Sequence, residues 1–155
     1  MELPRKAPDF SLYDQHGEVK SLADYAGKWV VIYFYPKDNT PGCTSQACSF
    51  RDERQVIAEL GGIEVIGVSK DSVRSHQKFA ENHDLTFTLL SDPAHKMTEA
   101  YDSWGPKKFM GREFLGTHRN TFIINPDGDI VREYRDVKPA GHAKLILDDL
   151  KSLRG

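Results

Sequence analysis

The sequence predicts an α/β fold with a central sheet that contains parallel strands and crossover helices. Residues 29–35 (WVVIYFY) and 63–69 (IEVIGVS) are short apolar runs of the kind that form buried strands. A segment with helical character follows each run, and this alternation of strand and helix is typical of a parallel sheet. The length of 155 residues suits a single domain, expected over residues 1–155.

The first third of the chain is expected to form a hairpin, the first buried strand and a long helix. Residues 9–13 and 18–21 are strands around a turn at 14–17, and Ser21 caps a short turn at 22–25 that ends by Gly27. A strand at 28–35 precedes a helix over 43–60, a segment without glycine or proline. Its apolar stripe is Cys43, Ala47, Phe50 and Ile57, and the pair Gly61 and Gly62 ends it.

The remaining elements follow from the same signals. After the strand at 63–69, Asp71 or Ser72 caps a helix to about residue 83, and a short strand covers 87–90. A helix over 91–101 comes next, and then a solvated loop over 103–116. Strands at 116–124 and 129–134 flank a hairpin turn at 125–128, and a C-terminal amphipathic helix carries Ala143, Ile146, Leu147, Leu150 and Leu153.

Charge and hydropathy exclude some partners. The 21 basic and 23 acidic side chains nearly balance, so we expect neither nucleic acid nor an anionic membrane as the main partner. No apolar run has the length of a membrane span, and the first residues lack the apolar core of a signal peptide. We therefore expect a cytoplasmic protein, where two cysteines indicate catalysis or redox sensing rather than a structural disulfide.

Both cysteines lie in residues 36–48 (PKDNTPGCTSQAC), between the strand at 28–35 and the helix. In open α/β sheets, ligands bind outside the carboxyl end of a strand. The free N–H groups and the dipole of a helix N-terminus stabilise an anion, so a thiol in the first turn is more acidic and, when partly exposed, reactive. Buried, inert cysteines are the alternative, but they do not need such a loop.

Three loop residues have separate uses. Pro41 fits the start of a helix, where its missing N–H costs nothing. Gly42 leaves the backbone open to a ligand. Thr40 either caps the helix through its hydroxyl or binds a substrate oxygen, and both roles remain open.

The pattern Pro36-x-x-x-Thr40-x-x-Cys43 resembles the active-site motif of the peroxiredoxins. Cys48, five residues later, resembles the resolving cysteine of the PrxQ or bacterioferritin comigratory protein group, and residues 7–10 (APDF) are similar to the opening of many peroxiredoxins. The resemblance implies a thioredoxin-like fold, with a central mixed β-sheet flanked by helices and an N-terminal β-hairpin extension. It also implies a monomer without cofactor or metal.

The resemblance further implies a thiol peroxidase for hydrogen peroxide and organic hydroperoxides. Cys43 forms a sulfenic acid, Cys48 converts it to an intramolecular disulfide, and thioredoxin or a similar dithiol reduces that bond. Thr40, Gly42, Cys43 and Arg119 bind the peroxide, and Pro36 shields the thiolate from water. Residues 116–124 (GTHRNTFII) resemble the strand that begins with the active-site arginine, which selects Arg119; by pattern alone a surface ion pair would be the ordinary role.

Helix geometry restricts the disulfide. Five residues at about 1.5 Å rise and 100° each separate the two Cα atoms by roughly 8–9 Å, on different faces. A disulfide requires them within about 7 Å, so the first turns must unwind if Cys48 is helical.

Two other functions of the cysteine pair remain open. A thioredoxin-type oxidoreductase would have Cys-x-x-Cys, and a redox sensor could use the same pair without turnover. His76 and His83 could share a helix face, but they do not form a recognised ligand pattern. His118 should point away from Arg119 across the strand.

Overall fold

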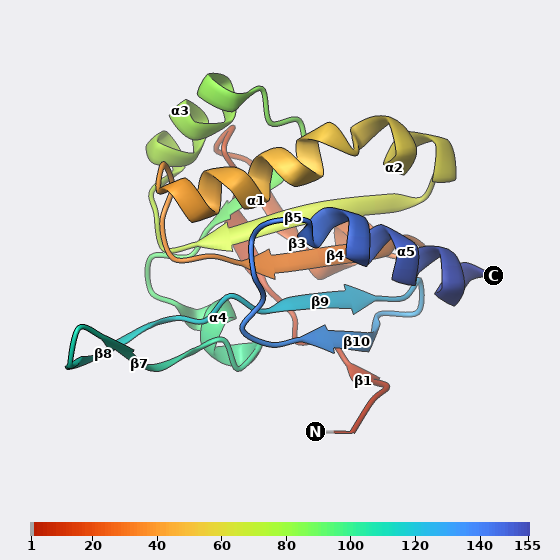
Figure 1. Ribbon diagram of the computed structural model, residues 1–155. Coiled ribbons are helices and arrows are strands. Elements are labelled where there is room, and N and C mark those ends of the chain that lie inside the picture. The colour runs from red at the N-terminus through yellow and green to blue at the C-terminus, as the bar shows by residue number, and fades with distance from the viewer. Residues whose placement is uncertain (1) are drawn as a thin grey trace.

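A mixed sheet of eight strands forms the centre of the computed structural model, which describes residues 2–155 (Figure 1). In spatial order its strands are β1 (Arg5–Lys6), β10 (Asp129–Tyr134), β9 (Thr121–Ile124), β4 (Trp29–Phe34), β5 (Ile63–Ser69), β6 (Thr88–Ser91), β2 (Ser11–Tyr13) and β3 (Val19–Ser21). The strands β4, β5 and β6 are parallel, and every other pairing in the sheet is antiparallel.

Helices cover both faces of the sheet. The helical segments are η1 (Leu22–Tyr25), α1 (Pro41–Asp52), α2 (Arg54–Leu60), α3 (Val73–His83), α4 (Lys96–Ala100) and α5 (His142–Arg154). Residues of α1, α3 and α5 share one apolar cluster with the sheet, and η1 and α4 contribute to the cluster on the opposite face. Within residues 2–155, none of these helices is both long and apolar enough to cross a membrane.

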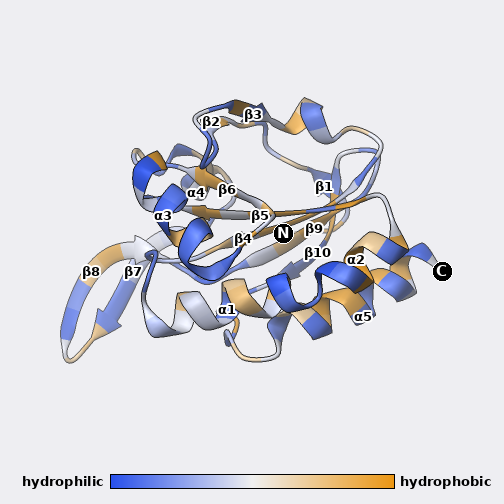
Figure 2. Ribbon diagram, turned by 90° about the horizontal axis from the view of Figure 1, so that it is seen from above, coloured by the Kyte–Doolittle hydropathy of each residue, from blue (hydrophilic) through white to orange (hydrophobic). Residues whose placement is uncertain are grey.

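The burial of β4 on both of its faces explains why its sequence is a continuous apolar run. Val31 and Tyr33 point into the cluster beneath α1 and α5, whereas Val30, Ile32 and Phe34 point into the opposite cluster. A parallel strand that is buried on both faces needs apolar residues at every position. Figure 2 shows the resulting concentration of apolar residues in the central strands.

These features confirm the predicted fold class, including the N-terminal hairpin of β2 and β3. The strands β5 and β10 have the predicted bounds, Ser72 caps α3, and Gly61 follows α2 with a positive φ. Asn125 closes the turn before β10, because its side-chain oxygen accepts from the backbone N–H groups of Asp127 and Asp129.

The prediction of one helix over residues 43–60 was wrong. The segment forms two helices, because Glu53 leaves the helical conformation (φ −92°, ψ 6°) and its N–H bonds to the carbonyl of Phe50. This three-residue hydrogen bond tightens the turn, and no glycine or proline marks it in the sequence.

The prediction of a loop over residues 103–116 was also wrong. β7 (Trp104–Phe109) and β8 (Arg112–Thr117) form a separate two-stranded hairpin that projects from the body of the protein (Figure 1). Its turn consists of Met110 and Gly111, both with positive φ, which suits a tight hairpin. The hairpin shows little alternation of apolar and polar residues because most of its residues are exposed.

Two further bounds differ from the prediction. The strand expected over residues 116–124 is interrupted, since β8 ends at Thr117 and β9 begins at Thr121. The helix expected over 91–101 is only α4, because the Asp92 carboxylate accepts from the N–H and hydroxyl of Thr98 and holds the preceding residues in a turn.

Candidate active site

The candidate site lies where β4 leads into α1. Pro36 is half-buried at the beginning of the connecting loop, and Pro41 is the first residue of α1, as predicted. Pro41 has no N–H, and the first hydrogen bond back to the loop joins Thr44 N to Thr40 O at 2.9 Å. The N–H groups of Gly42 and Cys43 are therefore left without helical partners. Two backbone donors are available at the mouth of the helix.

Thr40 occupies the N-cap position, but its hydroxyl does not cap the helix. It donates to the carbonyl of Lys37 at 3.0 Å and closes a turn over residues 37–40. The capping role offered for its side chain was therefore wrong. Because the hydroxyl hydrogen is used within the turn, the oxygen keeps its lone pairs for a donor outside it.

Cys43 lies in the first turn of α1 and is only 1% exposed. The expected partial exposure of this thiol was therefore wrong. Its sulfur is covered by Arg119, whose Nη2 donates to Cys43 Sγ at 3.1 Å, while Nη1 donates to Gln46 Oε1 at 3.0 Å. A guanidinium and the helix mouth thus act on the same sulfur, an arrangement that stabilises negative charge there.

The interruption between β8 and β9 positions Arg119. The Arg119 carbonyl accepts from Val137 N at 2.8 Å, and the next carbonyl, that of Asn120, accepts from Phe34 N at 2.9 Å. The Arg119 backbone is therefore fixed beside the end of β4, from which its side chain reaches α1. His118 makes a 3.4 Å contact with Asp136 instead.

The absence of a side chain at Gly42 leaves room for the guanidinium of Arg119. A Cβ atom at position 42 would lie 2.9 Å from Arg119 Nη2, which is closer than such atoms approach. The sequence predicted that this glycine opens the backbone to a ligand. The structure shows that it also makes room for the guanidinium.

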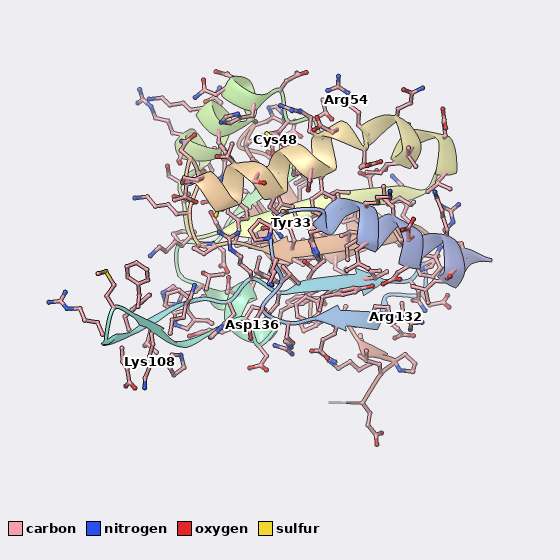
Figure 3. All side chains as sticks on the ribbon, viewed as in Figure 1. Tyr33, Cys48, Arg54, Lys108, Arg132 and Asp136 are labelled. Atoms are coloured by element: carbon pink, nitrogen blue, oxygen red, sulfur yellow. The ribbon has the colours of Figure 1, made fainter. Side chains whose placement is uncertain are left out.

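Cys48 is half-buried within α1, and both cysteines are free thiols. In Figure 3 it lies on the side of α1 toward α3, away from the centre of the sheet where Tyr33 is labelled. The two cysteines are five positions apart in the helix, which corresponds to roughly 8–9 Å between their Cα atoms. As expected from the sequence, this distance excludes a disulfide while α1 is intact.

Three residues near the site were not found from the sequence. Gln46 is fully buried one turn after Cys43, a position that would suit an apolar residue, and its Nε2 has no partner among the described residues. Tyr33 is buried beneath the helix, and burial, followed by the Cys43 thiol, raises its pKa well above 10.0. Burial and then the Arg119 charge lower the pKa of Lys107 on β7.

The two histidines of α3 have different surroundings. His76 is fully buried and contacts Asp38 and the carbonyl of Leu90, whereas the ring of His83 packs edge-on against Phe79. Asp38, Asp71 and His76 converge within 4.8 Å. Both ring nitrogens of His76 already have protein partners, so the ring has no free lone pair for a metal.

The chain is similar in sequence to a known family and to named proteins over most of its length. The model of the AhpC/TSA family matches residues 3–133. Peroxiredoxin Bcp of Bacillus subtilis is 48% identical over 99% of this chain and 97% of its own. Peroxiredoxin Bcp of Escherichia coli K12 is 45% identical over 94% of this chain and 92% of its own.

The fold is also similar to those of solved structures. A cysteine-to-serine variant of Xylella fastidiosa PrxQ superimposes with a TM-score of 0.93 at 34% identity, over 100% of this chain and 98% of its own. The bacterioferritin comigratory protein of Xanthomonas campestris, described for its alkyl peroxide reduction activity, gives 0.89 at 38% identity, over 94% and 92%.

Proposed function

This chain belongs to the AhpC/TSA family and is a peroxiredoxin of the PrxQ/Bcp group, and on that premise we propose that Cys43 reduces hydrogen peroxide and organic hydroperoxides. The observation that carries the proposal is the 3.1 Å contact between Arg119 Nη2 and Cys43 Sγ at the mouth of α1. A cation and a helix N-terminus both favour the thiolate, which is the attacking species.

In the proposed reaction, the Cys43 thiolate attacks one peroxide oxygen and the O–O bond breaks. The sulfur is oxidised to a sulfenic acid, and the other oxygen leaves as hydroxide or alkoxide and takes a proton from water. Arg119, the N–H groups of Gly42 and Cys43, and the Thr40 oxygen align the peroxide and stabilise the leaving charge. Pro36 limits access of water to this space.

Cys48 then attacks the sulfenic sulfur, a disulfide forms and one water leaves. The first turns of α1 unwind to bring the two sulfurs together, because the intact helix holds them too far apart. Thioredoxin or a similar dithiol supplies the two electrons that restore both thiols. We place this cycle in a monomer in the reducing cytoplasm, as one domain over residues 1–155.

The test is a coupled assay with thioredoxin, its reductase and NADPH. NADPH consumption that depends on peroxide and on Cys43 is the expected result. A protein that is oxidised by peroxide but never turns over with any dithiol would support a redox sensor instead. Rapid exchange with disulfide substrates, without peroxide consumption, would support a thiol–disulfide oxidoreductase.

A further inference from the structure

A cluster of buried polar side chains lies behind the loop that carries Thr40. Asp38 is 4% exposed and His76 is 0% exposed, and we call the group the Asp38 cluster: Tyr35, Asp38, Asp71, Ser75 and His76. None of these residues takes part in the chemistry proposed above. A buried carboxylate is costly unless its oxygens are paired, so the contacts of Asp38 decide what the cluster does.

The carboxylate of Asp38 is fully partnered. Its Oδ1 accepts from the hydroxyl of Tyr35 at 2.6 Å, and its Oδ2 accepts from the hydroxyl of Ser75 at 2.8 Å. The same Oδ2 lies 2.7 Å from Nδ1 of His76. The backbone N–H of Asp38 donates to Oδ2 of Asp71 at 2.8 Å. One loop residue is therefore joined to the end of β4, to the segment after β5 and to α3.

Both ring nitrogens of His76 face oxygen atoms of the protein. Its Nε2 lies 2.9 Å from the carbonyl oxygen of Leu90, which can only accept, so Nε2 carries a hydrogen. Its Nδ1 lies 2.7 Å from Oδ2 of Asp38, and one proton shared between these two atoms makes the contact while Oδ2 also accepts from Ser75. The position of this proton decides the charges of the two groups but not the geometry of the contact. Burial, followed by the Asp38 charge, raises the pKa of Tyr35, so its hydroxyl keeps the hydrogen that it donates to Asp38.

The cluster acts on the proposed active site through the turn over residues 37–40. Asn39, directly after Asp38, has a φ of 63°, and Thr40 closes the turn on the carbonyl of Lys37. Thr40 is also the N-cap residue of α1, and its carbonyl accepts from Thr44. The position of Asp38 therefore fixes both the Thr40 oxygen and the direction in which α1 begins.

We propose that the buried Asp38–His76 pair positions the turn over residues 37–40, so that the Thr40 oxygen and the N–H groups at the mouth of α1 stay aligned on Cys43. The proposal rests on the proposed function, since the reaction served is peroxide attack. Asp38 and His76 are positioning residues, because they touch neither the sulfur nor the peroxide. The network needs its hydrogen-bond geometry, not its net charge, to do this.

Two substitutions separate geometry from charge. In Asp38→Asn, the amide oxygen still accepts from Tyr35, and the amide nitrogen donates to Ser75 and to a His76 that has lost its Nδ1 proton. In Asp38→Ala, all these bonds are lost. The matched control is Asp14→Ala, which removes a buried carboxylate with two backbone hydrogen bonds in the N-terminal hairpin.

The main measurement is the second-order rate constant of Cys43 oxidation by hydrogen peroxide. Asp38→Ala should slow it about 10- to 100-fold, the scale of a misplaced reactive group, while Asp38→Asn and Asp14→Ala stay within about 3-fold of the wild type. Asp38→Ala reacting at the wild-type rate would overturn the proposal. So would Asp38→Asn as slow as Asp38→Ala, or Asp14→Ala with an equal loss.

Two readouts do not depend on peroxide activity. Hydrogen exchange of the amides at 42–44 should be faster in Asp38→Ala and unchanged in Asp38→Asn. The proton NMR spectrum of the wild type should show a deshielded resonance, slow to exchange with water, for the proton that His76 Nδ1 shares with Asp38; its exchange as fast as in an exposed imidazole overturns the proposal even if Asp38→Ala does not fold. If the wild type consumes no peroxide, the proposed function fails, and these two readouts still decide whether the pair holds the turn.

Discussion

Arg119 Nη2 lies 3.1 Å from Cys43 Sγ, and the two residues are 76 positions apart in the chain. Replacing Arg119 by alanine should slow peroxide attack about 10- to 100-fold, since a hydrogen bond to a charged group contributes about 1.5–3 kcal/mol. Arg119→Lys should be intermediate, because an ammonium lacks the planar fork that reaches Gln46 as well.

Stopped-flow oxidation kinetics and the ultraviolet absorbance of the thiolate across pH check this prediction. Arg112→Ala, an exposed arginine on β8, is the matched control and should react normally. An unchanged rate and an unchanged thiolate titration in Arg119→Ala would mean that another group supplies the cation.

Gly42→Ala should reduce activity without reducing stability. The new methyl group displaces the end of the Arg119 side chain, which it would approach to 2.9 Å. Alanine is the better helix former by up to about 1 kcal/mol, so the free energy of unfolding should stay equal or rise. Denaturant unfolding tests the predicted stability, and peroxide kinetics test the predicted loss of activity. Ser45→Ala, on the exposed side of α1, is the control. Normal kinetics would contradict the assigned role of Gly42.

The two cysteines should have separable roles. Cys43→Ser should consume no peroxide, because no other thiol lies at the helix mouth. Cys48→Ser should still consume one equivalent of peroxide but should not turn over with thioredoxin. Single-turnover peroxide consumption, with mass spectrometry of the sulfenic acid, distinguishes them. Rapid consumption by Cys43→Ser would refute the assignment of the nucleophile.

Oxidation should unwind the first turns of α1 and leave the sheet intact. Both cysteines lie in this helix as free thiols, and a disulfide cannot span five helical residues. Hydrogen exchange at 42–51 should therefore be faster in the disulfide form, while β5 stays protected. Peroxide-treated Cys48→Ser, which cannot form the bond, is the control. Equal protection in both redox states, with the disulfide confirmed by mass, would contradict local unwinding.

His142 should make stability depend on pH. It is 3% exposed, and burial lowers its pKa from 6.5 to about 4. Between these two pH values the unfolded chain binds more protons than the folded protein. The contribution of His142 to the free energy of unfolding is therefore complete above pH 6.5 and decreases as the pH falls toward 4. The loss should reach roughly 3 kcal/mol at about 1.36 kcal/mol per pKa unit.

Urea unfolding between these pH values, compared with His142→Gln, measures that contribution. The variant should lose less stability on acidification than the wild type. An identical pH dependence in the two proteins would show that other groups cause the acid loss.

The site residues that lie close together in the chain could be predicted from the sequence. Those that folding brings to the site from distant positions could not. Residues 36–48 hold a strand end, a proline at the helix start and both cysteines within one segment. Arg119 could be chosen among 21 basic residues only through the family resemblance, because tertiary folding, not local pattern, brings it to Cys43. Asp38 gave no signal, and His76 was considered only with His83 on a shared helix face, since each looks like an ordinary surface residue until the fold buries it.

The errors in the fold have a common physical cause. The hairpin of β7 and β8 was missed because it is exposed and therefore lacks an apolar face to read. The interruption at 118–120 was missed because backbone bonds to distant residues hold it. Hydrophobic periodicity records neither an exposed hairpin nor a backbone held by distant residues.

The break at Glu53 lets α1 fold and unfold as a unit separate from α2. An isolated helix of 12 residues is marginal in water, so α1 depends on packing against the sheet and α5 for its order. Because the hydrogen-bond ladder is interrupted at Glu53, helix–coil fraying that starts at Cys43 is not propagated into α2. Arg51 also ties the last turn of α1 to the carbonyl of His83. In the proposed cycle, the segment that unwinds is thus a small cooperative unit, short enough to re-form quickly when the disulfide is reduced.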